Sequence, residues 1–344
     1  MADVVAEDSS KINGIILLRA IAALGVCLLH IQLATGYHGN AFLDYLIANG
    51  QQGVPIFFVI SGFVLPYSLF KKSYRIHDFF SFILKRSVRV DLPYWACIFL
   101  LFAFALLPLS YLNFTNLLLH ITYLVPFVKH ARWYSEIFWT LSIEFQFYII
   151  LGLSYPIFNK IPVLVSVTIL ILLSAFCTDY TKRGIIISNV FQFTFGYIAF
   201  LSYTKLLKRE WFWVSFSIFT VYIIFAKSII SGLVPALTVL FILFYTSGRR
   251  IPVFNFLGTI SYSLYLMHVP ASLLTIRLLK PWIRHSGPMS LACLCSSIVL
   301  ASIFYWMIER PSLRLSKTIL TKYFISFPVL AKSKADLAKS AGLK

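Results

Sequence analysis

Charged side chains are scarce in this sequence of 344 residues. Asp, Glu, Lys and Arg together make up 12% of it, whereas hydrophobic residues make up 59%. A water-soluble protein of this length needs more charge than this to cover its surface. The sequence therefore predicts an all-α, polytopic integral membrane protein.

Several motifs of known chemistry are also missing. The sequence has no glycine-rich phosphate-binding loop, no G-x-S-x-G elbow, no cluster at metal-ligand spacing and no histidine followed four residues later by an aspartate. ATP-driven transport, serine-hydrolase chemistry and a bound metal are therefore not expected. The five cysteines lie in or beside apolar segments and suggest no disulfide framework, so we interpret them as small core residues.

Apolar segments predict about ten transmembrane helices. They are residues 12–35, 50–70, 90–110, 136–158, 161–177, 185–203, 211–227, 229–247, 254–276 and 288–308. Residues 111–127 are also apolar, but Asn113, Asn116, His120 and Pro126 interrupt them, which predicts a re-entrant or interfacial segment. Because the first ten residues are polar and acidic, we expect no cleavable signal peptide and a first segment that stays in the membrane.

Basic residues are distributed unevenly among the predicted loops. With the N-terminus in the cytoplasm, 21 Lys and Arg fall on the cytoplasmic side and 8 on the opposite side. The positive-inside rule then predicts that both termini are cytoplasmic. We expect a cytoplasmic segment 1–11, a membrane domain 12–315 and a basic tail 316–344 that lies on anionic lipids. Membrane orientation, rather than nucleic acid, thus accounts for the net charge of +18.

Arg19 and His30 lie in the first apolar segment, which is otherwise free of charge from Asn13 to Ala34. Their spacing of eleven residues is close to three helical turns, so both side chains project from one face, about 16 Å apart. Because a cation and an imidazole are costly in a bilayer, we expect both to face a cavity or a partner. An imidazole titrates near neutral pH and suits general-base catalysis.

Arg86 and Arg89 lie at the predicted cytoplasmic start of the third span, in the sequence KRSVR. Residues three apart share one face of a helix. Two guanidinium groups on that face could clamp phosphates, although the positive-inside rule alone also accounts for cations at this place.

Glu144 is a lone carboxylate in the aromatic segment 139–148. Such a group is costly in a membrane, so it is either a site residue or a partner for a buried cation or hydroxyl. In the second span, Ser61 and Gly62 lie near the middle of the membrane, where small residues usually allow close helix packing.

The ninth span carries Ser261, Tyr265 and His268 near one face. After the tenth span, the sequence Glu309-Arg310-Pro311 is expected to end the helix rather than to bind a substrate.

Together these motifs resemble the acyltransferase 3 family of bacterial membrane proteins, which modify surface polysaccharides and related glycans. The resemblance covers residues 12–315 and rests on six motifs in order. They are R-x10-H at 19–30, FFVISGF at 57–63, RSVR at 86–89 with the PYW that follows, WTLSIEFQFY at 139–148, ISYSLYLMH at 260–268 and ERP at 309–311. The sequence departs from the commonest family pattern near Pro55, where many members carry an aspartate, and at Phe145, where many carry a second glutamate.

The resemblance implies an enzyme of the bacterial inner membrane that uses acyl-CoA, commonly acetyl-CoA, and no metal. It would transfer the acyl group to a hydroxyl of a glycan, either free or linked to a lipid. The family implies that His30 is catalytic, and that Arg86 and Arg89 contact the phosphates of CoA, with Arg19 as a third basic residue.

Glu144 is predicted as the second catalytic residue, and further residues are predicted to bind the substrate. Glu144 would orient His30 or bind sugar hydroxyls, and His268 is the next candidate for the base. Substrate-binding candidates, some of which could stabilise an oxyanion, are Ser61, Tyr148, Tyr265 and His268.

Two alternative functions remain open at this stage. A transporter or flippase for a glycan or a lipid carrier would also suit buried Arg, His and Glu. A different class of membrane acyltransferase would act on a lipid or a peptide. Release of free CoA separates an acyltransferase from a carrier.

The charge distribution generates a topology prediction. Reporter fusions at Ser73 and at the C-terminus should both report a cytoplasmic position, and a fusion at Tyr37 should report an external one. An external C-terminus would contradict the predicted number of spans.

Overall fold

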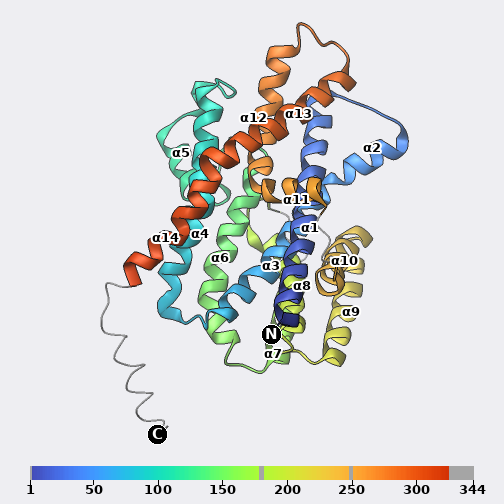
Figure 1. The fold of residues 1–344 in the computed structure, drawn as a ribbon, viewed down its shortest axis with the longest axis vertical. Helices are drawn as coiled ribbons and strands as arrows, with labels where there is room; N and C mark the ends of the chain where they lie inside the picture. Colours follow the sequence, from blue (N-terminus) through green and yellow to red (C-terminus); the bar gives the residue numbers. More distant parts are fainter. Residues whose placement is uncertain (1, 178–181, 248–250, 325–344) are drawn as a thin grey trace.

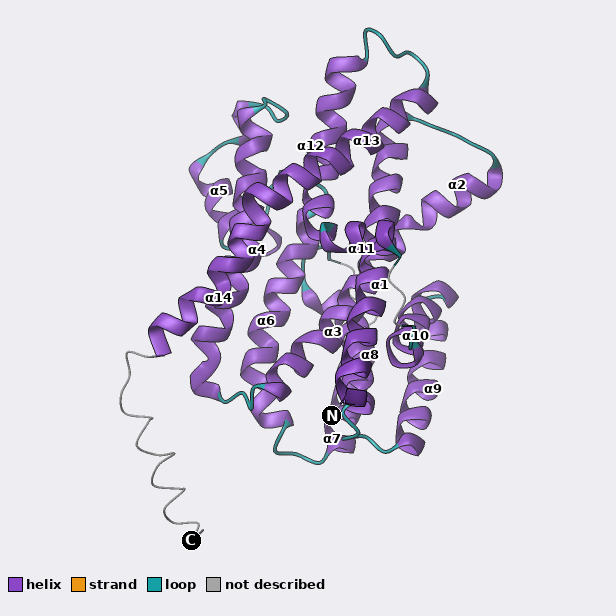
Figure 2. Cartoon of the chain, viewed as in Figure 1, coloured by secondary structure: helices purple, strands orange, loops and turns teal. Residues whose placement is uncertain are grey.

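The computed structural model describes residues 2–177, 182–247 and 251–324. In this part of the chain every regular element is a helix, and the helices pack side by side in one bundle (Figures 1 and 2). The α-helices are α1 (Ala2–Thr35), α2 (Ala41–Ala48), α3 (Gly53–Lys71), α4 (Phe79–Ala103), α5 (Phe114–Ile121), α6 (Phe138–Phe158), α7 (Val163–Phe176), α8 (Val190–Tyr203), α9 (Arg209–Ala226), α10 (Ile229–Phe244), α11 (Pro252–Thr259), α12 (Ser261–Leu279), α13 (Ser286–Phe304) and α14 (Arg310–Phe324).

Length and composition allow five helical stretches of the described chain to cross a membrane. They are Ile12–Thr35, Ala41–Lys71, Phe138–Phe158, Ile186–Tyr203 and Ser286–Thr318. Two shorter apolar helices, Val163–Phe176 and Ile229–Phe244, accompany them. The all-helical membrane fold is therefore confirmed, while ten crossings and the orientation of the termini stay predictions.

The helix boundaries differ from the predicted spans in three places. Helix α1 begins at Ala2, so its backbone is continuous with the predicted N-terminal segment. Helix α4 begins at Phe79 rather than at residue 90. The predicted ninth span is divided at Ile260 between α11 and α12. The first two differences move a boundary, and the third divides one predicted span into two helices.

The tenth helix does not end at Glu309, so that expectation is wrong. A π-helical turn, η6 (Tyr305–Glu309), follows α13, and α14 continues from Arg310. A π turn is wider than an α turn, and it changes which way the following side chains point. Pro311 lies in the first turn of α14, directly after this π-helical turn. Residues 325–344 of the predicted basic tail lie outside the described residues.

Helices α3 and α8 approach closely at two glycines. A Cβ at Gly62 would lie 2.4 Å from the carbonyl oxygen of Phe193, and a Cβ at Gly196 would lie 2.2 Å from that of Val59. Any side chain at either position would force the two helices apart. The packing role predicted for the Ser61-Gly62 pair is thus confirmed for Gly62.

Two apolar clusters form the core of the bundle. One is built mainly from α3, α8, α9 and α10, and the other from α1, α4, α12 and α13. Helix α6 contributes to both, with Ile143 and Phe147 in the first cluster and Phe138 and Leu141 in the second. Polar side chains on α6 that lie between these residues are therefore held where the two clusters meet.

The segment between α4 and α6 folds back along α4, and we call residues 104–137 the hairpin segment. Its Tyr123 hydroxyl donates to the buried Asp91 of α4 at 2.8 Å, and Ser142 of α6 donates to the Tyr123 carbonyl at 3.1 Å. The only α-helix of this segment, α5, has eight residues and is too short to cross a membrane. Phe145, where many family members carry glutamate, stacks on Tyr123 with ring centroids 4.7 Å apart.

A buried histidine fastens the two arms of the hairpin segment. His120 donates from Nδ1 to the Asn116 carbonyl at 2.8 Å and accepts at Nε2 from the backbone N–H of Tyr134 at 3.0 Å. Burial lowers the pKa of His120 to about 4. The imidazole is therefore neutral at ordinary pH, as its role as an acceptor requires.

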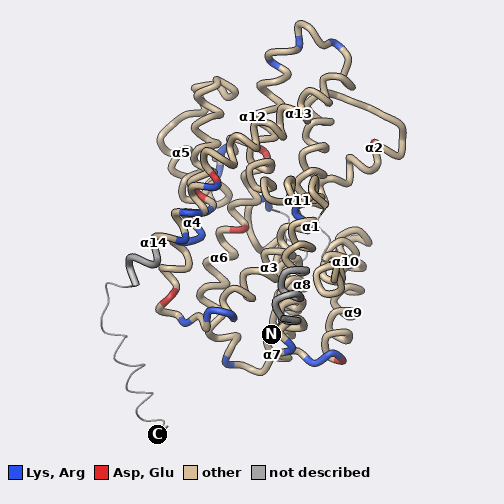
Figure 3. Tube along the Cα trace, viewed as in Figure 1, with Lys and Arg blue, Asp and Glu red and all other residues tan. Residues whose placement is uncertain are grey.

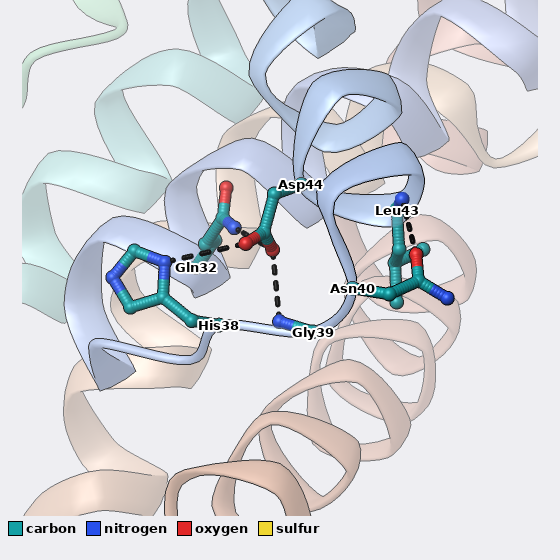
Figure 4. Close-up of polar contacts among 6 residues, drawn as sticks. All are labelled: Gln32, His38, Gly39, Asn40, Leu43 and Asp44. Atoms are coloured by element: carbon teal, nitrogen blue, oxygen red, sulfur yellow. Dashed lines mark hydrogen bonds and ion pairs between the residues drawn. The ribbon is translucent and has the colours of Figure 1, made fainter.

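The connection between α1 and α2 is closed by one carboxylate (Figure 4). Asp44 accepts from Gln32 Nε2 at 3.0 Å and from the backbone N–H of Gly39 at 2.9 Å, and it lies 3.5 Å from His38. Asn40 caps α2 by accepting from the backbone N–H of Leu43 at 2.8 Å. These contacts hold the chain close to the C-terminal end of α1, which carries His30 two residues before Gln32.

Candidate active site

A cavity of about 170 Å³ lies between the two apolar clusters, and we call it the inner cavity. Six elements line it: α1, α3, α4, α6, α12 and η6. Its polar lining residues are Arg19, Ser61, Arg86, Arg89, Thr140, Glu144, Tyr148, Ser261, Tyr262, Tyr265 and Glu309. Residues far apart in the sequence are thus brought to one place.

Three guanidinium groups and two carboxylates face the inner cavity. Arg19 donates from Nε to the Ser261 hydroxyl at 3.0 Å. Arg86 lies against two aromatic rings, 5.8 Å from the centroid of Phe82 and 5.9 Å from that of Tyr148. Across the described ranges, no ion pair within 4.0 Å joins these arginines to a carboxylate. Most of their N–H groups therefore stay available to an anionic ligand.

The two carboxylates are held by hydroxyl groups instead. Glu144 accepts from the Ser61 hydroxyl at 3.1 Å. Glu309 accepts from the backbone N–H of Ser263 at 3.1 Å and from the hydroxyl of the same residue. Neutral donors fix both acids without consuming the charge of the arginines.

Glu309 is a cavity residue that the sequence did not reveal. Its side chain is only 4% exposed, and it enters the inner cavity from the last residue of the π-helical turn. We expected this acid to mark a helix end. The sequence feature that could have indicated this position is an acid directly after a long apolar segment, with no helix-capping residue between them. Helical periodicity, however, does not predict a π turn.

A second cavity of about 620 Å³ adjoins the inner one, and we call it the mouth cavity. Arg86 and Arg89 line both cavities. The charged residues of the mouth cavity are Lys72, Asp78, Lys85, Arg86, Arg89 and Lys317. Five cations and one carboxylate thus line the mouth cavity. The cations come from the α3–α4 connection, α4 and α14 (Figure 3).

The two histidines of the predicted site lie beside the inner cavity and not in its lining. His30 and His268 pack against each other with ring centroids 5.0 Å apart. Each Nδ1 contacts a backbone carbonyl, that of Val26 at 2.9 Å and that of Leu264 at 3.0 Å. A carbonyl only accepts, so each Nδ1 carries the proton and each Nε2 keeps a free lone pair. His30 is half-buried, while His268 is fully buried with no partner at Nε2.

Tyr265 connects the inner cavity to the histidines. It lines the cavity, and its ring centroid lies 5.9 Å from that of His268 and 6.0 Å from that of Phe57. Its hydroxyl lies 2.8 Å from the Thr140 hydroxyl and 3.3 Å from the carbonyl oxygen of Ile137. Tyr265 and Phe57 therefore form an aromatic layer on the side of the inner cavity that adjoins His268.

The structure brings the predicted residues together in two groups. The inner cavity collects Arg19, Ser61, Arg86, Arg89, Glu144, Tyr148 and Tyr265, and the adjacent histidine pair is His30 with His268. Arg19 and His30 both contact α12, through Ser261 and His268, as the eleven-residue spacing predicts. Glu144 has no contact with His30 among the described residues, because the Val26 carbonyl orients that imidazole.

The fold and the site thus define a helical membrane protein with a charged cavity inside the bundle. The chain matches the family model of the acyltransferase domain named acyltransferase 3 over residues 12–307. It belongs to this family and is a membrane acyltransferase. No curated protein and no solved structure matches it significantly.

Substitution of Glu309 tests whether this acid belongs to the site. Glu309→Gln keeps the shape and one hydrogen bond to Ser263 but removes a negative charge facing Arg19 and Arg89. We expect acyl transfer to fall at least about tenfold, by analogy with the loss of one preorganised charged group, while membrane abundance stays near normal. Acyl transfer per amount of protein is the measurement, and Glu136→Gln, at an exposed acid, is the control. Unchanged transfer would exclude Glu309 from the site.

Proposed function

We propose that this acyltransferase takes an acyl group, acetyl in the first instance, from acyl-CoA bound in the mouth cavity and transfers it to a hydroxyl of a glycan. The observation that carries this proposal is the pair of adjoining cavities that share Arg86 and Arg89. The glycan acceptor rests on the family resemblance.

The charge of the mouth cavity supports a polyanionic donor. CoA carries a pyrophosphate and a third phosphate on its nucleotide, and five cations with a single carboxylate complement them. Arginine suits this role because its planar fork binds phosphate oxygens through two N–H groups. The cavity volume of about 620 Å³ is in the range of ligand-binding sites.

The inner cavity is suited to the slender arm of the donor. Its walls include apolar side chains from α1, α3 and α4, such as Ile15, Val54 and Val90. The arm must cover the distance between the levels of Arg19 and His30, which is about 16 Å along a helix. To reach the histidines, the thioester would have to pass the aromatic layer formed by Tyr265 and Phe57.

His30 is the favoured base because it is the less buried of the two imidazoles. Its Nε2 would take the proton of the acceptor hydroxyl while the hydroxyl oxygen forms a bond to the thioester carbonyl carbon. The tetrahedral intermediate would then collapse, the carbon–sulfur bond would break, and the imidazolium would return its proton to the CoA thiolate. The products are an ester and free CoA.

Tyr265 is the favoured donor to the oxyanion. Ser61 already donates to Glu144 and the Tyr148 ring packs against Arg86, whereas Tyr265 contacts His268 directly. The Thr140 hydroxyl also bonds to the Ile137 carbonyl, at 2.9 Å. Tyr265 could therefore turn its hydroxyl to an oxyanion without leaving that carbonyl unpaired.

The two shared arginines give the first test of the donor site. Arg86→Ala and Arg89→Ala should each weaken acyl-CoA binding by about tenfold or more, since a charge-assisted bond to phosphate contributes about 1.5–3 kcal/mol. Lysine should restore only part of the affinity, because it lacks the fork. Binding to purified protein is measured by calorimetry, with Arg284→Ala, outside both cavities, as the control. Unchanged affinity in both alanine variants would show that CoA does not bind in these cavities.

The histidine pair gives the test of the chemistry. His30→Ala should reduce acyl transfer by about a hundred- to ten-thousand-fold, the usual contribution of general-base catalysis. His30→Gln should be equally inactive, because an amide cannot accept the proton. Acyl-CoA binding should persist in both variants, since the phosphates are held elsewhere.

Product ester and free CoA are both measured, because a carrier would release no CoA from acyl-CoA. His268→Ala is assayed beside the His30 variants. If His30→Ala keeps near-normal turnover while His268→Ala does not, the base is His268. If both variants turn over normally, this mechanism is wrong.

A further inference from the structure

A third polar cavity lies in the hairpin segment, near the end of α4 that is opposite to the mouth cavity. It has a volume of about 290 Å³, and we call it the hairpin pocket. The residues that matter for its chemistry are Tyr111, Asn113, Thr115, Lys129, His130 and Arg132. Phe102 near the C-terminal end of α4 contacts Tyr134, two residues from Arg132, with ring centroids 5.0 Å apart. The mouth cavity, in contrast, adjoins the first turns of α4.

The cations of the hairpin pocket are unneutralised. Lys129 and Arg132 are exposed, and neither forms an ion pair within the described part of the chain. In the predicted topology both belong to the minority of basic residues on the non-cytoplasmic side. The positive-inside rule therefore does not account for them, whereas an anionic ligand would.

The pocket is held in shape by a buried amide. Asn116, which is 8% exposed, donates from Nδ2 to the carbonyl of Arg132 at 3.1 Å and accepts from its backbone N–H at 3.4 Å. The Arg132 guanidinium lies 5.5 Å from the centroid of the Tyr111 ring. Together with His120, which joins the same two arms, Asn116 fixes the backbone before any ligand arrives. Little ordering cost then remains for binding.

Apolar side chains alternate with the pocket residues along the first arm. Leu109, Leu112 and Phe114 are 71%, 44% and 80% exposed, and they are interleaved with Ser110, Tyr111 and Asn113 of the pocket lining. Exposed apolar side chains of this size, grouped together, are typical of a surface that contacts a membrane or a partner. A cationic pocket and an exposed apolar rim are thus combined within a few residues.

We infer that the hairpin pocket binds the phosphate headgroup of a membrane amphiphile. Lys129 and Arg132 contact the phosphate, while Leu109, Leu112 and Phe114 contact the start of the hydrocarbon chain. The phosphate could belong to a bilayer phospholipid or to a polyprenyl carrier of a glycan, and the two share this chemistry. The inference does not depend on acyl-CoA as the donor.

The test uses the full chain reconstituted in nanodiscs of phosphatidylcholine, with native mass spectrometry to count bound lipid. The probes are a polyprenyl phosphate, phosphatidylglycerol and soluble glycerol phosphate. In the double variant Lys129→Gln with Arg132→Gln, affinity for the lipid phosphate should fall by about thirtyfold. The variant removes two basic side chains, and each of them contributes a similar share of the binding free energy for the phosphate. The matched control is Lys280→Gln with Arg284→Gln, which removes the same charge outside the pocket.

A second variant, Leu112→Ser, tests the apolar rim. It should weaken the binding of both lipid probes but leave the binding of glycerol phosphate unchanged. A preference for polyprenyl phosphate identifies a carrier, and equal binding of phosphatidylglycerol identifies a bilayer lipid. Unchanged lipid affinity in the double variant, or glycerol phosphate bound as tightly as the lipids, overturns the inference. Acyl-CoA affinity, measured in parallel, should be normal in the double variant, which separates this outcome from a failure of the donor proposal.

Discussion

The cost of placing charge inside an apolar helical bundle governs the arrangement of this protein. Five ionisable groups, three arginines and two glutamates, face one small cavity between two apolar clusters. Direct ion pairing would have been the simplest way to offset that cost, but it would also have cancelled the positive charge. Hydroxyl groups satisfy the carboxylates instead, aromatic rings pack against Arg86, and a serine hydroxyl accepts from Arg19. The cavity can thus be both stable in the membrane and attractive to an anion.

Much of this arrangement could be predicted from the sequence because it depends on helical periodicity and on the cost of buried charge. The spacing of Arg19 and His30 implies one face of a helix, and both side chains contact α12. The depth of Glu144 in an aromatic span implies a polar partner, and Ser61 is that partner. These predictions follow from local geometry and an elementary energetic rule, so they need no knowledge of tertiary structure.

The rest depends on local irregularity and on contacts between distant helices. Glu309 enters the cavity through a π turn, and helical periodicity predicts no such turn. Lys317 lines the mouth cavity because α14 continues past Pro311, although a proline after an acid and a base suggests a helix end. The pairing of His30 with His268 joins residues 238 positions apart, which no periodicity reveals.

The position of the histidines beyond the aromatic layer is relevant to how an acyltransferase limits hydrolysis of its acyl donor. Under the proposed mechanism, a thioester in the inner cavity would lie on the cavity side of Tyr265, whose ring packs against His268. The base would then meet the thioester only when the donor arm is fully inserted. Under the proposed mechanism, separation of the phosphate-binding cations from the base would favour transfer over hydrolysis, by the same exclusion of water that makes the buried charges costly.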